Sequence, residues 1–157
     1  MKSRKALILA VAVLALTGTA ALAHSDDYLD TQRAPNGGQQ RMAGAYHFEL
    51  VVARDSKEAK ENAVVVYVTD HAGTKVSTVG AGGTATILAG KQKASVKLVP
   101  DGDNRLKGVG KYASTPDMKA VVSVTVAGKP AEQARFTPLA PIAPAAAAKN
   151  GHTDHKH

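Results

Sequence analysis

The chain of 157 residues contains no cysteine and no tryptophan, and aromatic residues make up only 4% of it. Without cysteine the chain can form neither a disulfide nor a thiolate, so any metal site must use His, carboxylate, Met or backbone ligands. The sequence also lacks the G-x-S-x-G elbow, the H-E-x-x-H pair and the P-loop, which mark common classes of enzyme. We therefore expect a protein that is not an enzyme.

The positive charge of the chain is modest and scattered. Its formal net charge is +7, which falls to +4 when Lys2, Arg4 and Lys5 are removed with the N-terminal segment. Few aromatic residues lie beside the remaining basic ones, so the sequence offers no platform for stacking bases. This composition argues against nucleic-acid binding and favours lysines on solvated strand faces.

Residues 1–23 have the three parts of a secretory signal peptide. Residues 1–5 are basic, residues 6–15 are uninterrupted apolar, and residues 21–23 form a small-x-small cleavage site. The apolar run is short for a membrane span of about 20 residues, which makes an uncleaved membrane anchor the weaker alternative. We expect cleavage after Ala23, export to the periplasm if the source is Gram-negative or out of the cell otherwise, and no membrane insertion of the mature chain.

Short runs of β-branched residues separated by Gly, Asp, Asn and Pro indicate an all-β fold. We expect a single immunoglobulin-like antiparallel β-sandwich over residues 39–137, with a small OB-like barrel as the alternative. Residues 24–38 are expected to form a flexible or loosely docked arm, and residues 138–157 a disordered Pro/Ala-rich tail that contains histidines. The expected strands cover residues 44–54, 62–70, 74–79, 82–90, 93–99, 104–112, 119–127 and 132–137. No stable helix is expected after the signal peptide, because the one helix-favouring stretch, Ser56–Glu61, is too short.

The clearest pattern lies on the strand that follows the Gly37-Gly38 turn. Because side chains alternate on a strand, His47 and Glu49 face one side, and the residues expected to be buried face the other: Tyr46, Phe48, Leu50 and Val52. Two interpretations of the polar pair stay open. His47 and Glu49 could bind one divalent ion, with Met42 upstream as a thioether ligand if the ion is copper, or they could be an ordinary solvent-facing pair.

The second group of candidate ligands is Asp70-His71, at the end of the long apolar strand expected at residues 62–70. Asp-His-Ala-Gly is typical of a turn, in which the aspartate accepts backbone N–H groups and the glycine takes a positive φ. Taken alone, we favour this turn interpretation. A ligand role for His71 requires that the corner lies at the same end of the fold as Met42 and His47.

The remaining histidines lie near the two ends of the mature chain. If cleavage follows Ala23, the α-amine and imidazole of His24 can chelate one ion together, as in histidine-brace copper proteins. His152, His155 and His157 form a tract that can hold Cu²⁺, Ni²⁺ or Zn²⁺ weakly. For this tract we favour natural metal capture of low specificity over an expression tag or a solubilising tail.

Several of these segments resemble a family of small secreted β-sandwich proteins, which is related to N-terminal modules of the periplasmic adaptor subunits of heavy-metal efflux systems. In that family a Gly-Gly turn precedes a strand of the form aromatic or His, His, x, Glu, and the second strand ends in V-Y-V-x-D. The matching segments span about residues 36–137: Asn36–Gly38, Ala45–Val52, Val64–Asp70, Asn104–Gly108 and Ala134–Phe136. The resemblance implies metal handling in the periplasm, with His47 and Glu49 at the matching positions, while Asn36 stands where the family often has His. A fainter similarity to CopC-type copper-resistance sandwiches is based only on His24 and Asp70-His71.

We expect a periplasmic metal-binding protein that buffers copper, zinc or a similar divalent ion, or delivers it to an efflux system whose adaptor is the protein partner. The expected ligands are His47, Glu49, Met42, His71, His24, His152, His155 and His157. The alternative, from a different class, is a structural or protein-interaction module that docks on an envelope or efflux-adaptor partner without metal.

Overall fold

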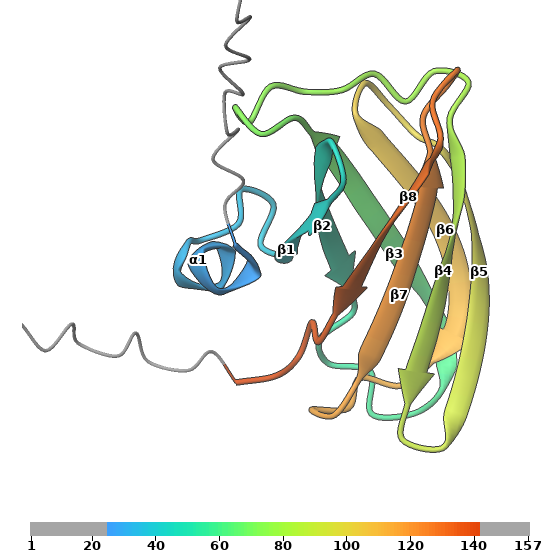
Figure 1. Cartoon of the computed structure of the whole chain (residues 1–157). Coiled ribbons are helices and arrows are strands. Elements are labelled where there is room, and N and C mark those ends of the chain that lie inside the picture. The colour runs from blue at the N-terminus through green and yellow to red at the C-terminus, as the bar shows by residue number, and fades with distance from the viewer. Residues whose placement is uncertain (1–24, 142–157) are drawn as a thin grey trace, which may run out of the picture.

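The structure, a computed structural model, describes residues 25–141 as one short helix and eight strands (Figure 1). Neighbouring strands are antiparallel and follow the order β1-β2-β3-β6-β5-β4-β7-β8. The elements are α1 (Asp26–Thr31), β1 (Gln39–Ala43), β2 (Tyr46–Val52), β3 (Lys60–Thr69), β4 (Gly82–Ala89), β5 (Gln92–Pro100), β6 (Arg105–Tyr112), β7 (Lys119–Thr125) and β8 (Ala131–Phe136). The expected all-β fold of antiparallel strands is confirmed.

The sheet curls until its first and last strands, β1 and β8, lie next to each other (Figure 1). Instead of a backbone ladder, Gln39 of β1 crosses this seam, and its Oε1 accepts a hydrogen bond of 2.8 Å from the backbone N–H of Thr137. The strands thus form a nearly closed barrel. Of the two architectures that the sequence left open, this sheet agrees with the small barrel, although eight strands exceed the five of an OB-fold.

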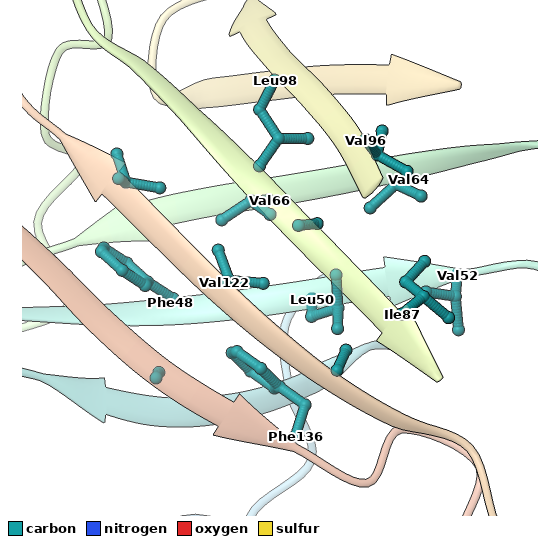
Figure 2. Close-up of a cluster of buried hydrophobic side chains, with 14 of the residues drawn as sticks. Phe48, Leu50, Val52, Val64, Val66, Ile87, Val96, Leu98, Val122 and Phe136 are labelled. Atoms are coloured by element: carbon teal, nitrogen blue, oxygen red, sulfur yellow. The ribbon is translucent and has the colours of Figure 1, made fainter. Parts of the chain in front are cut away.

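The core lies inside this curled sheet and is made mostly of aliphatic side chains, together with Phe48, Phe136, Tyr112 and Met118 (Figure 2). Three of the four residues expected to be buried on β2 are buried, namely Phe48, Leu50 and Val52. The fourth, Tyr46, is half-buried and stacks on Phe48 with 6.4 Å between the ring centroids. The period-two pattern therefore identified the inner face of β2.

The sheet turns a corner between β5 and β6, which pair only through Val99 with Lys107 and Pro100 with Leu106. At Gly108 the neighbouring strand comes so close that a side chain would collide with the carbonyl oxygen of Lys97. Glycine is therefore required there, because it alone permits this close approach of two backbones.

Three expectations about secondary structure are wrong. Residues 26–31 form α1, whose N-cap Ser25 accepts a hydrogen bond from the N–H of Tyr28, and the segment expected to be a loose arm buries Leu29 and Ala34. Residues 39–43 form β1, which was not expected because Gln, Gln and Arg have weak strand propensity. Residues 74–79 form no strand, only an isolated bridge between Lys75 and Thr69.

Ser56–Glu61, the stretch with helical propensity, forms no helix, as expected, and its last two residues begin β3. Residues 1–23, expected to be a signal peptide, and nearly all of the expected tail, residues 142–157, lie outside the described residues, so the expectations about them stay predictions. Between residues 25 and 141 there is no helix with the length and apolar character needed to cross a membrane.

Tyr112, at the end of β6, links this strand to β3 and to the first residue of the connection between β2 and β3. Its hydroxyl donates to the carbonyl oxygen of Ala63 at 2.6 Å and accepts from the N–H of Ala53 at 3.1 Å. The side chain is 1% exposed, and burial raises its pKa, so the hydroxyl stays protonated and able to donate.

We predict that Tyr112→Phe lowers the free energy of unfolding by about 2 kcal/mol, because it leaves two backbone groups without their partner. The measurement is urea denaturation followed by circular dichroism. Tyr46→Phe is the matched control, because it keeps the ring stack on Phe48. Equal midpoints for the two variants would contradict this role of the hydroxyl.

Candidate metal-binding site

The candidate site lies on the outer face of the sheet, across β1, β2 and β3. Met42, His47 and Thr69 are direct cross-strand partners, and residues paired in this way project from the same face. The neighbouring row consists of Gln40, Glu49 and Tyr67. The register therefore places Met42 beside His47.

His47 and Glu49 are not solvent-facing, although they point away from the core. Each is only 4% exposed. The expectation of an ordinary solvent-facing pair is therefore wrong, because polar segments from elsewhere in the chain cover this face. One is the turn at residues 34–38, and the other is the corner at residues 70–74.

The carboxylate of Glu49 is held by the turn that precedes β1. Its Oε1 accepts hydrogen bonds from the backbone N–H groups of Asn36 at 2.8 Å and Gly38 at 2.9 Å. Its Oε2 accepts a third, of 2.8 Å, from the Asn36 side-chain amide. These donors satisfy a buried carboxylate and fasten the turn to the sheet. We call this arrangement the Glu49 latch, and it places both oxygens in structural hydrogen bonds.

Asn36 and Gly38 each fit the latch for a stereochemical reason. Asn36 supplies two of the three donors, its backbone N–H and its side-chain amide. At Gly38 a side chain would collide with the backbone of Leu50, so the close approach needs glycine. The Asn36-Gly-Gly stretch that the resemblance singled out is therefore the partner of Glu49.

His47 is in contact with His71, although 24 positions separate them in the chain. The two rings stack with their centroids 5.0 Å apart and their planes 29° apart. The ring nitrogen Nε2 of His71 also lies 3.1 Å from the carbonyl oxygen of Gly44 in the turn between β1 and β2. The corner at residues 70–71 thus lies at the Met42 and His47 end of the sheet, which is the condition for a ligand role of His71.

The corner that presents His71 is the turn expected from the sequence. Asp70 Oδ1 accepts hydrogen bonds from the N–H groups of Ala72 at 2.9 Å and Thr74 at 2.8 Å, and Gly73 has a positive φ of 81°. The hydrogen bond from Thr74 is the largest of the effects that hold the pKa of Asp70 below its usual value. The turn and the ligand interpretations are therefore compatible, since Asp70 forms the turn and His71 projects from it.

Glu132 was not predicted as a site residue, and its side chain lies against the turn between β1 and β2. A side chain at Gly44 would collide with the carboxylate of Glu132, so the acid of β8 lies directly against the turn whose carbonyl meets His71. Glu132 is distant in the chain and belongs to no motif, so only the closure of the barrel reveals its position. It brings a negative charge to the end of the sheet that carries the two histidines.

The other expected ligands have different positions. Met42 is half-buried, and its backbone N–H donates to Asp26 Oδ1 of α1 at 2.9 Å. His24, His152, His155 and His157 lie outside the described residues. Within residues 25–141 no three His, Cys, Asp or Glu side chains are grouped so that they could hold a metal ion. The structure thus places His47 against His71 and opposite Met42. Glu49 is instead hydrogen-bonded to Asn36 and Gly38.

Comparisons of this chain with family models, with curated proteins and with solved structures found no match. The resemblance to the efflux-adaptor modules therefore stays a prediction based on the residues given above.

We predict that Glu49→Ala destabilises the protein by about 3 kcal/mol, because it removes the charged partner of three buried donors. Amide hydrogen exchange of Asn36 and Gly38 should accelerate, which urea denaturation alone would not show. Glu61→Ala, on the exposed part of β3, should stay within about 0.5 kcal/mol of wild type. Unchanged exchange at Gly38 in the Glu49 variant would contradict the latch.

A second prediction concerns acid stability. Because the pKa of Asp70 is lower in the folded protein than its ordinary value of 3.8, its ionised form favours folding above that pH, and this contribution is lost as the pH falls through the folded value. The stability difference between wild type and Asp70→Asn should therefore be largest near neutral pH and shrink below about pH 4. Urea denaturation at several pH values measures it, with the exposed Asp55→Asn as control. A pH-independent difference would refute the assignment.

Proposed function

We propose that this protein binds a copper ion at the outer face of the barrel, through His47 and His71 with the Met42 thioether as a third ligand. The observation that carries the proposal is the contact of the two imidazoles, 5.0 Å apart between centroids, brought together from β2 and from a separate corner. Imidazole and thioether form a donor set that favours copper over hard cations such as Mg²⁺ and Ca²⁺.

The hydrogen bonding of His71 supports a ligand role. A carbonyl oxygen only accepts, so the contact between His71 Nε2 and the Gly44 oxygen requires a proton on Nε2. In the neutral ring this leaves the lone pair on Nδ1 as the donor to a metal ion. Histidines that bind metals commonly donate their other N–H to a backbone carbonyl in this way, which fixes the ring orientation and raises its basicity.

The choice of ion rests on how few metal-binding side chains are grouped at the site. No group of three His, Cys, Asp or Glu residues is available within residues 25–141, which disfavours a tetrahedral zinc site built there. Cu(I) is a soft ion that accepts low coordination numbers, and thioether ligands select it. His71 is half-buried, whereas His47 is only 4% exposed, so His71 is the ligand nearer to solvent.

The expected export of the protein suggests a physiological role for this site. If residues 1–23 direct export as expected, the protein buffers copper in the periplasm or delivers it to an efflux adaptor. Met and His exchange copper without thiol oxidation, which suits an oxidising compartment and a chain without cysteine. His24, His152, His155 and His157 then act as auxiliary capture groups.

The test is a Cu(I) competition titration with a chromophoric chelator. It uses the exported chain with four substitutions that remove the terminal histidines, so that only the barrel site remains. These are His24→Ser, His152→Ser, His155→Ser and His157→Ser. We expect one copper ion per chain, and at least about tenfold weaker binding after His71→Ala. Met42→Leu should weaken Cu(I) binding more than Zn²⁺ binding.

Met118→Leu is the matched control, because Met118 is fully buried in the core and should not affect copper affinity. Circular dichroism of each variant checks folding. If the chain without the terminal histidines binds no copper at micromolar concentrations, the barrel site is refuted, and the metal-free interaction module becomes the better explanation.

A further inference from the structure

A second surface feature lies away from the two histidines, where the outer faces of β4, β7 and β8 meet the start of β5. There the surface is hollowed by about 580 Å³. Small-molecule sites typically occupy about 300–1,000 Å³ and are lined mainly by apolar groups with a few polar ones. The hollow therefore has the size of a ligand site, and it shares no residue with the candidate copper site.

The strand register builds this hollow from two rows of side chains. Leu88 of β4 stands between its direct cross-strand partners Lys93 and Lys119, and it is 44% exposed for a large apolar side chain. In the next row, Val121 of β7 lies between Thr86 and Arg135. Apolar side chains thus form the middle of the hollow, with a basic residue on both sides of Leu88 and on one side of Val121.

All charged side chains that line the hollow are basic. Lys93, Lys119 and Arg135 are exposed, and none of them makes an ion pair with another residue of the described chain. The fourth, Arg41, is buried and already paired with Asp30. Three cations around an exposed leucine are complementary to a ligand with an apolar body and an anionic head.

We propose that this hollow binds a single-chain anionic amphiphile, an acyl chain with a carboxylate head group. The acyl chain would lie on Leu88 and Val121, where its burial removes apolar surface from water. The carboxylate would pair with Lys119 and Arg135, of which arginine offers a fork that matches a carboxylate.

The strand pairing disfavours a peptide at the same place. β4 pairs with both β5 and β7, and β7 pairs with both β4 and β8, so the strands that carry Leu88 and Val121 have no free edge. A peptide could not add a strand there and would leave its own backbone groups unpaired. A ligand without backbone donors has no such penalty.

The test uses dodecanoate, below its micelle concentration, titrated into the full exported chain labelled for methyl NMR. We expect saturable shifts of the Leu88 and Val121 methyl groups. Dodecyltrimethylammonium has the same chain with the opposite charge and should bind at least about tenfold more weakly, as the rim of cations requires. Equal binding of the two, or no binding of dodecanoate, would overturn the proposal.

Charge-reversal variants test the assigned residues. Lys119→Glu with Arg135→Glu should abolish dodecanoate binding, whereas Lys107→Glu with Lys111→Glu, at exposed positions of β6, makes the same change of net charge and should leave it intact. Val121→Trp, which fills the hollow without changing charge, should also block binding. Equal loss in both charge-reversal pairs, or displacement of dodecanoate by an acidic apolar peptide, would contradict the assigned site and ligand.

Discussion

The buried carboxylate of Glu49 is the constraint on which the outer face of this barrel depends. Removing a carboxylate from water costs several kcal/mol unless hydrogen bonds replace its hydration. Here three N–H donors from Asn36 and Gly38 replace the water around the carboxylate, and they can do so only while residues 34–38 lie across β2. This turn leads directly into β1. There the backbone N–H of Met42 donates to Asp26 of α1, and Met42 lies opposite His47.

The latch separates two roles that the sequence pattern combines. His47 and Glu49 look like a pair because they alternate on one strand, yet the structure gives them different partners. Glu49 serves the fold through the latch, and His47 meets His71 from the corner that Asp70 organises. A polar strand face can therefore hold a structural charge and a candidate ligand two residues apart.

Much of the fold was predictable because strong local signals agree with it. The alternation on β2, the apolar run of β3 and the turn at Asp70 all appear as expected, since burial and turn stereochemistry leave direct marks in the sequence. β1 could not be recognised, because pairing with β2 rather than propensity makes Gln39–Ala43 a strand. For α1 a signal did exist, namely Ser25 as N-cap before Asp26 and Asp27 in the first turn. The contact of His47 with His71 depends on the register of β2 with β3, which sets His47 opposite Thr69, and the position of Glu132 depends on the closure of the sheet. Neither long-range feature has a local signature in the sequence.

The two proposed sites use different physical means on one barrel. At the first, two stacked imidazoles and a thioether are the proposed donors to copper. At the second, three cations that form no ion pair within residues 25–141 line a hollow together with an exposed leucine. The copper proposal requires that His47 and His71 bind the same copper ion. The most direct measurement is an anomalous difference map at the copper edge, from crystals of the copper-loaded protein. We expect a peak within coordination distance of both imidazoles, with Met42 adjacent. A well-ordered barrel with copper bound elsewhere, or with none beside the two histidines, would contradict it.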